Sequence, residues 1–282
     1  MYKCFAKINY TLNVLPKTHG ELHKLCSIAP KINLFDEVSV KRNSTGKITI
    51  SCTDKRVPTN SQNLVYKVLD AFNKYRGIKQ GYSVVIKKNI PISSGLGGGS
   101  SDAAGALLEA MKLGDVHYGY YQLLEVVRGL GSDIPQFLVS DTTMIEGEGE
   151  EITPIEDKMD VFIVLVKPAE GVSAKEAYEA FDKYGISSEK DDSIITDLKN
   201  DNFEDAITKM NNDLEAPVLQ IKPKLKGIKE KMKALGLPFV MMSGSGSCFF
   251  GLTKDKKLAE KVANHFEKKG YYTKVVEKAT KL

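Results

Sequence analysis

The segment from Gly95 to Asp102 contains the residues whose types and spacing are best suited to chemistry. It reads Gly-Leu-Gly-Gly-Gly-Ser-Ser-Asp, and its three adjacent glycines leave a strip of backbone without any Cβ. A bulky anion can therefore approach several amide N–H groups directly. We predict that an Ala-rich helix begins near Ser101, with Asp102 helping to cap it, so the positive end of its dipole would add to the attraction. The segment predicts a loop that binds phosphate.

Two better-known phosphate motifs do not match this segment. A Walker A loop requires a lysine after the glycines, and none follows them here. A dinucleotide-binding GxGxxG motif starting at Gly95 would need a glycine where Ser100 stands. The remaining alternative is a flexible linker or a tight structural turn. An apolar strand before the loop and a strong helix after it favour a positioned loop.

A second stretch of small residues runs from Ser243 to Ser247, between two apolar segments. Taken alone, it is typical of a plain hairpin turn. Taken with the first loop, it has a functional interpretation, because two loops of small residues can approach one polyphosphate from two lobes.

Two charged residues have both an ordinary and a chemical interpretation. Lys7 lies in an apolar stretch where a lone lysine is usually a solvated edge residue. Asp133 follows Gly131-Ser132 and is by default a helix cap. In a phosphate-transferring protein, an aspartate can accept the proton of an attacking hydroxyl. A lysine beside it keeps that carboxylate ionised and stabilises developing negative charge.

The elements that must position these residues form an α+β pattern. The first part predicts strands over 33–40 and 46–52 joined by a turn at 43–46, a helix over 61–76 capped from 59–61, a strand over 82–87, and helices from 101, over 120–130 and from 134. The second part predicts strand 160–166, helices within 173–233, strands 238–242 and 247–252, helix 255–269 and strand 271–277. With the first helices taken as one block, the order is β-α-β-β-α-β, which favours an antiparallel sheet with helices on one face. An acidic, turn-rich connector at 146–151 places a boundary between domains 1–152 and 153–282.

Composition excludes several classes of protein. The chain has 282 residues, long enough to bury a core without disulfides or a structural metal. Its net charge is only +4, which disfavours a nucleic-acid partner. The longest apolar run, 161–166, is far too short to cross a bilayer. Four scattered cysteines and no signal-peptide pattern predict a cytoplasmic protein with reduced thiols.

The motifs together resemble those of the GHMP kinase superfamily. The similarity rests on Phe5-Ala6-Lys7-Ile8-Asn9, on the ten residues from Gly95 to Ala104, and on Met242-Ser243-Gly244-Ser245-Gly246. Gly131-Ser132-Asp133-Ile134-Pro135 and Asn212-Asp213-Leu214-Glu215 also match family segments. The form GLGGGSSDAA is most similar to that of the 4-diphosphocytidyl-2-C-methyl-D-erythritol kinase family. This resemblance covers residues 5 to about 252 and implies a two-lobed fold, with an N-terminal lobe like the second domain of ribosomal protein S5 and a ferredoxin-like C-terminal lobe.

The resemblance also implies roles for individual residues. Asp133 would be the catalytic base and Lys7 its activating partner, while Asn9, His23 and Tyr178 would hold the acceptor, the last two at its cytosine. The residues expected to bind ATP are Gly95, Leu96, Gly97, Gly98, Gly99, Ser100, Ser101, Ser243, Gly244, Ser245 and Gly246. ATP and Mg²⁺ are the implied cofactors, with Ser101 a candidate magnesium ligand. The implied reaction phosphorylates the C2 hydroxyl of a nucleotide-diphosphate acceptor in non-mevalonate isoprenoid synthesis. No nucleic-acid or membrane partner is expected, and the chain would be a monomer or a weak homodimer.

Two positions depart from the family pattern, both on the acceptor side. Leu22 stands where the family has an aromatic residue before the histidine, and Ala174 replaces the threonine of a Val-Ser-Thr segment. Loss of one base-stacking ring costs on the order of 1–3 kcal/mol. Two alternatives therefore stay open: a GHMP kinase with a mevalonate- or homoserine-like acceptor, and a nucleotide-binding relative without catalysis.

Overall fold

The computed structural model of the chain describes residues 1–17, 23–139 and 141–279. Its contacts form two compact units, each assembled from several segments. The first unit comprises Met1–Ala6, Leu34–Ile92 and Gly97–Ser140, and the second comprises Lys7–Asn33, Ser93–Leu96 and Asp141–Leu282. The chain thus passes between the units more than once, and the domain boundary expected at residue 152 stays a prediction.

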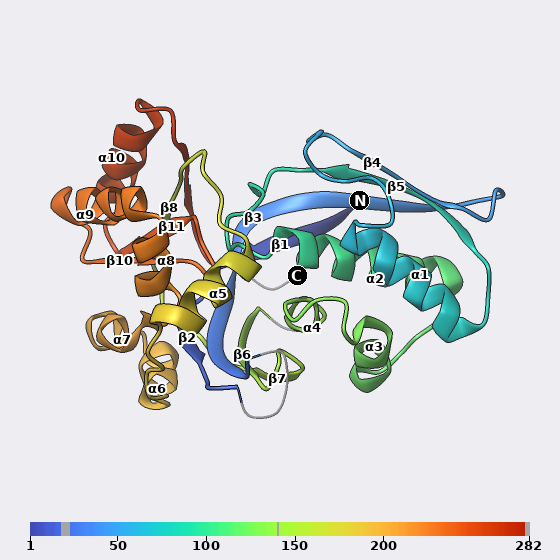
Figure 1. Cartoon of the computed structure of the whole chain (residues 1–282), viewed down its shortest axis with the longest axis horizontal. Coiled ribbons are helices and arrows are strands. Elements are labelled where there is room, and N and C mark those ends of the chain that lie inside the picture. Colours follow the sequence, from blue (N-terminus) through green and yellow to red (C-terminus); the bar gives the residue numbers. More distant parts are fainter. Residues whose placement is uncertain (18–22, 140, 280–282) are drawn as a thin grey trace. The chain divides into compact units, whose positions relative to one another are not determined.

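The first unit packs helices against a sheet (Figure 1). Strand β5 lies between β4, which runs parallel to it, and β3, which runs antiparallel. The apolar core between sheet and helices includes Val38, Val84, Leu69 and Leu107. The elements are β1 (Tyr2–Lys7), the second half of β3 (Leu25–Asn43), β4 (Ile48–Cys52), α1 (Leu64–Arg76), β5 (Gly81–Lys87), α2 (Gly98–Gly114), α3 (Tyr120–Val127) and α4 (Ile134–Phe137).

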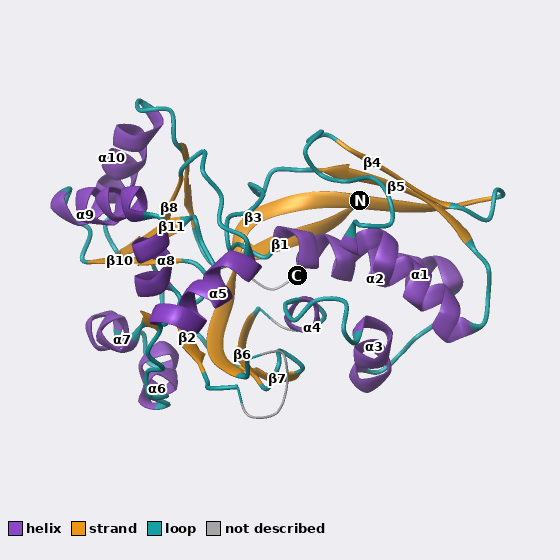
Figure 2. Ribbon diagram, in the orientation of Figure 1, coloured by secondary structure: helices purple, strands orange, loops and turns teal. Residues whose placement is uncertain are grey.

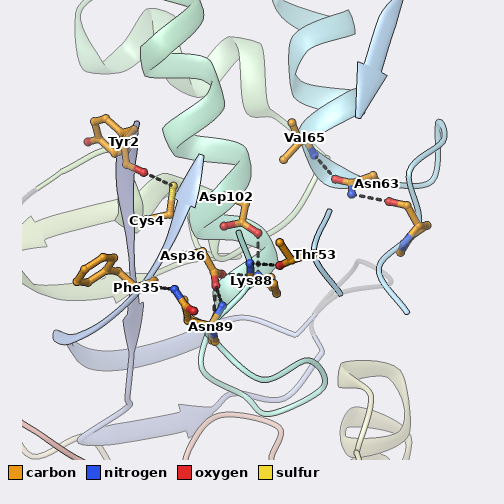
Figure 3. Close-up of polar contacts among 12 residues, drawn as sticks. Tyr2, Cys4, Phe35, Asp36, Thr53, Asn63, Val65, Lys88, Asn89 and Asp102 are labelled. Atoms are coloured by element: carbon orange, nitrogen blue, oxygen red, sulfur yellow. Dashed lines mark hydrogen bonds and ion pairs between the residues drawn. The ribbon is translucent and has the colours of Figure 1, made fainter. Parts of the chain in front are cut away.

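The turn at 43–46 joins β3 to β4 as predicted, and the two strands are not neighbours in the sheet, because β5 is inserted between them. One local expectation for this unit is corrected. Helix α1 begins at Leu64, and its cap is Asn63, not the residues at 59–61. The Asn63 side chain accepts a hydrogen bond from the Val65 amide at 2.8 Å (Figure 3). This capping is what a helix start requires, since the first amides have no partner within the helix.

The second unit contains a four-stranded antiparallel sheet with the order β10-β11-β8-β12. Helices α9 and α10 pack against it (Figure 2). This packing buries Val164, Val240 and Phe249 with Met232 and Val262. The elements are β2 (Thr11–Val14), the first half of β3, β6 (Thr142–Glu146), β7 (Glu151–Pro154), β8 (Phe162–Lys167), α5 (Ala174–Tyr184), α6 (Ser193–Lys199), α7 (Phe203–Lys209), β9 (Asn211–Asn212), α8 (Glu215–Ile221), η1 (Pro223–Leu225), α9 (Lys226–Ala234), β10 (Phe239–Met242), β11 (Phe249–Thr253), α10 (Lys256–Glu267) and β12 (Tyr272–Val276).

The strand order confirms the predicted α+β class and the β-α-β-β-α-β arrangement of the C-terminal part. The acidic connector at 146–151 contains a turn, as predicted. It turns between β6 and β7, which pair antiparallel with Glu146 opposite Glu151. Among the residues described, no helix has the length and apolar character needed to span a membrane.

Candidate active site

The first glycine loop ends in the first turn of α2, which begins at Gly98 and not near Ser101 as predicted. Gly95 and Gly97 have φ angles of 75° and 71°, a left-handed conformation that glycine adopts without strain. The helix starts without a side-chain cap. The amides of Gly98, Gly99 and Ser100 therefore have no partner within the helix, and the first turn of this 17-residue helix is suited to an anion.

Asp102 does not cap α2, contrary to the expectation. It lies within the helix, buried, and its carboxylate is 2.7 Å from Lys88 Nζ (Figure 3). Lys88 also pairs with the fully buried Asp36 at 2.5 Å. Burial raises the pKa of Asp102 to about 7; Lys88 lowers it, and the second carboxylate, Asp36, adds to the rise. Asp36 in turn accepts the amides of Asn89 and Ile90, so the triad connects the end of β5 to the start of α2.

The two loops of small residues touch each other within the second unit. Ser243 Oγ donates to the Gly95 carbonyl at 3.1 Å, and the Cys248 amide donates to the Ser94 carbonyl at 3.2 Å. A Cβ on Gly95 would lie 1.9 Å from the Ser243 carbonyl oxygen, which no side chain can tolerate. The two loops therefore lie in contact, and this contact depends on glycine at position 95. Their approach to one polyphosphate from two lobes stays a prediction.

Lys7 and Asn9 lie beside this loop pair. Lys7 is buried, its amide donates to the Leu96 carbonyl at 3.0 Å, and its Nζ donates to Asn9 Oδ1 at 2.7 Å. Asn9 Nδ2 donates onward to Ser27 Oγ at 2.8 Å. A Cβ on Gly244 would lie 3.2 Å from Lys7 Nζ, so the second loop also lies against this lysine. The solvated edge interpretation of Lys7 is wrong.

Asp133 belongs to the first unit, where it precedes the short helix α4. It occupies the cap position, but its side chain makes no capping hydrogen bond. Instead Gln136 Nε2 donates to Asp133 Oδ1 at 3.1 Å. The default role of a capping aspartate therefore does not account for this carboxylate.

The two residues expected to hold a cytosine are brought together in the second unit. The rings of His23 and Tyr178 are stacked, with centroids 5.7 Å apart and an interplanar angle of 19°. His23 Nδ1 lies 2.8 Å from the Leu15 carbonyl and Nε2 lies 2.7 Å from Asp182 Oδ1, so both nitrogens of the ring are held. A hydrogen bond from Lys17 lowers the pKa of Asp182. The departure at Leu22 lies outside the described residues.

Two parts of the site escaped prediction. The Lys88 triad was missed, although one signal was present: a charged residue inside an Ala-rich, apolar helix must have a partner when it is buried. The contacts of Asn212 were also missed. Its side-chain Nδ2 donates to the Met242 and Gly244 carbonyls, both at 2.8 Å, and so holds the second loop.

The described residues provide no group of three or more His, Cys, Asp or Glu side chains suited to a metal ion. Magnesium bound to a nucleotide needs only one or two protein ligands, the rest being phosphate oxygens and water. Ser101, buried in the first turn of α2, fits that sparse requirement and stays a candidate protein ligand.

Comparisons with known proteins agree with this geometry. The family model for the GHMP kinases N terminal domain matches residues 63–140, and that for the GHMP kinases C terminal domain matches residues 194–272. The chain is 37% identical over 268 residues to the 4-diphosphocytidyl-2-C-methyl-D-erythritol kinase of Clostridium beijerinckii, covering 95% of each protein.

Solved structures give the same result. A crystal structure of 4-(cytidine 5'-diphospho)-2C-methyl-D-erythritol kinase matches 98% of this chain and 99% of its own, with a TM-score of 0.79 and 28% identity. An L. major mevalonate kinase matches with a TM-score of 0.74 at 11% identity, covering 99% of this chain and 96% of its own, which shows the fold alone. The chain therefore belongs to the GHMP kinases, a group of small-molecule kinases that phosphorylate alcohols, and within them to the family of the 4-diphosphocytidyl-2-C-methyl-D-erythritol kinases.

Proposed function

We propose that this kinase transfers the γ-phosphoryl group of ATP to the C2 hydroxyl of 4-diphosphocytidyl-2-C-methyl-D-erythritol, in the cytoplasm, as a step towards isoprenoid precursors. The observation that carries phosphoryl transfer is the contact between the loops at Gly95 and Ser243, with Lys7 beside them. The identity of the acceptor rests on the names of the full-length relatives. The stacked rings of His23 and Tyr178 also support a cytidyl acceptor, because a pyrimidine base stacks on aromatic rings.

The proposed chemistry forms one bond and breaks one. The acceptor oxygen attacks the γ-phosphorus, the bond from the γ-phosphorus to the β,γ-bridging oxygen breaks, and ADP leaves. Asp133 takes the hydroxyl proton, and Lys7 stabilises the negative charge that develops on the transferred group. The amides at the start of α2 and in the second loop hold the phosphates by hydrogen bonds already in place before the reaction. Bound Mg²⁺, held with the help of Ser101, would neutralise charge on the β- and γ-phosphates.

Substitution of Asp133 shows whether this residue is the catalytic base or only a helix cap. Asp133→Ala should lower kcat by about 10²–10⁴-fold, the range for losing a general base, with the Kd for ATP kept. Asp255 is the matched control, because its side chain caps α10 by accepting the Lys257 and Leu258 amides. Asp255→Ala should cost about 1 kcal/mol of stability and leave turnover unchanged. Coupled ADP release and thermal unfolding measure both effects.

Lys7→Ala should lower kcat less than Asp133→Ala does, because Lys7 stabilises charge without accepting the proton. An unchanged rate in Asp133→Ala would remove that residue from the chemistry, and an unchanged rate in Lys7→Ala would do the same for Lys7.

A panel of acceptors tests the substrate. The cytidyl acceptor should support ADP release, and mevalonate and homoserine should not. Activity on either of these, with none on the cytidyl compound, would replace the proposed acceptor by another alcohol. No ADP release with any acceptor would favour the nucleotide-binding alternative.

A further inference from the structure

The second loop is held by side chains from a distant segment, Asn212 to Glu215. Asn212 Nδ2 donates to the carbonyls of Met242 and Gly244, both at 2.8 Å. Glu215 Oε2 accepts the amide of Met242 at 2.7 Å, and this buried carboxylate also pairs with Lys229. Both polar groups of the Met242 main chain are therefore fixed by side chains of one segment.

The Asn212 contacts decide where Gly244 lies. The loop's own bonds, from the Gly246 amide to the Ser243 carbonyl and from the Ser243 amide to the Cys248 carbonyl, do not involve Gly244. Its carbonyl is held by Asn212, and its α-carbon lies against Lys7: a Cβ there would be 3.2 Å from Lys7 Nζ and 3.0 Å from the Gly95 carbonyl oxygen. A shift of Gly244 would therefore disturb the first loop and the lysine together.

The adjacent residue, Asp213, holds a different part of the same unit. Its Oδ2 accepts the Val14 amide at 2.8 Å and the Ser188 amide at 3.2 Å, and its Oδ1 accepts Ser188 Oγ at 2.5 Å. Val14 ends β2 and precedes Leu15, whose carbonyl contacts His23. The two consecutive side chains thus hold different segments: Asn212 holds the second loop, and Asp213 holds the end of β2 on the acceptor side.

We propose that Asn212 is a positioning residue for ATP, which sets the second loop in the conformation that receives the phosphates. The inference rests on the proposed function only in taking ATP as the ligand of that loop. Glu215 supports the same loop from its amide side. Neither residue is catalytic, because both act through the main chain of 242–244.

The test measures binding of ATP with Mg²⁺ by calorimetry, without any acceptor. Asn212→Asp keeps the shape of the side chain but turns a carboxylate towards two carbonyl oxygens, so the Kd for ATP should rise at least tenfold. Asn212→Ser, which keeps one hydroxyl donor, should give a smaller rise and remains informative if the first variant does not fold. Asp213→Asn is the matched control next to it, and its Kd for ATP should stay within threefold of wild type.

Asn73→Ala is the control that distinguishes a general loss of stability from a specific loss of ATP binding. Asn73 is also buried and also donates to a carbonyl, that of Gln80, at the end of α1. If the Asn212 variants lower the melting temperature as Asn73→Ala does, with an unchanged Kd for ATP, the inference is overturned. An equal rise in Asp213→Asn would also overturn it. A wild-type protein that binds ATP but does not phosphorylate the cytidyl acceptor would contradict the proposed function instead, and the binding comparison would still decide the role of Asn212.

Discussion

Asp36 and Asp102 share one ammonium group, that of Lys88, in the interior of the first unit. All three side chains are at most 5% exposed. With both carboxylates ionised the cluster has a net negative charge, and Asp102 Oδ1 has no hydrogen-bond partner among the described residues. A buried charge without compensation is costly, and protonation of one carboxyl relieves it. This balance accounts for the raised pKa of Asp102, about 7.

The triad therefore predicts a stability that depends on pH. The folded chain holds the Asp102 proton at higher pH than the unfolded chain, whose aspartates titrate near about 4. The resulting stabilisation is complete below about pH 4 and is lost as the pH rises through about 7. Asp102→Asn removes this titration. As the pH rises from about 5 to about 8.5, the free energy of unfolding of wild type should therefore fall relative to that of the variant by an amount on the order of 2 kcal/mol.

Thermal unfolding of both proteins at several pH values measures this gain, and groups that titrate in both cancel in the comparison. Parallel curves for the two proteins would show that Asp102 does not titrate in this range.

At the scale of single residues, sequence reasoning paired the two loops of small residues from their composition, and the family resemblance placed His23 and Tyr178 at one base. Each pair is in contact in the structure, and their roles in binding stay predictions. Sequence reasoning failed for Asp102, because a helix cap and a buried ion-pair partner look alike until the start of the helix is known. The capping rule placed that start three residues too late, since a glycine cap followed by two glycines is an unusual start for a helix.

At the scale of elements, the meeting of the two loops depends on a backbone that has no side chain at Gly95. We predict that Gly95→Ala destabilises the protein by more than the 1–2 kcal/mol of left-handed strain and weakens ATP binding at least tenfold. Gly129→Ala is the control, because its φ of 72° is nearly the same and nothing lies within 4 Å of the position of its Cβ.

Chemical unfolding and calorimetric titration with ATP compare the two variants. Equal losses in both would mean that only backbone strain matters and that the contact with Ser243 is dispensable.

Helices and the C-terminal sheet could be predicted because their apolar periodicity is local. The length of β3 could not be predicted from the sequence. Its middle contains Pro30 and Lys31, which weaken a strand assignment from sequence, but the Lys31 amide donates to the Asp141 carbonyl and the Pro30 carbonyl accepts the Ile8 amide. Partners far along the chain satisfy this backbone, and no local pattern reveals them. The insertion of β5 between β3 and β4 was missed for the same reason.

At the scale of the whole molecule, each compact unit is discontinuous in sequence. Leu12 and Val14 of β2 belong to the same apolar cluster as Val164, Val218 and Phe249. A fragment of residues 153–282 would therefore lack part of its own core. We predict that it does not fold cooperatively, whereas the full chain does, as judged by thermal unfolding followed by circular dichroism.

Co-expression of residues 1–152 with that fragment should restore part of the structure, because the missing apolar side chains are then supplied. A fragment 153–282 that unfolds with the full-length cooperativity would show that the contribution of β2 is unnecessary.

The close approach of the Gly95 and Ser243 backbones has a consequence for how this enzyme can change. The two positions are 148 residues apart in the chain, yet even one added methyl group at Gly95 would displace main-chain atoms at Ser243. The obstructing atoms, the Ser243 carbonyl and the Gly246 nitrogen, are main-chain atoms that every residue carries. A library randomised at position 95 should therefore return almost only glycine, whatever residue is allowed at position 243.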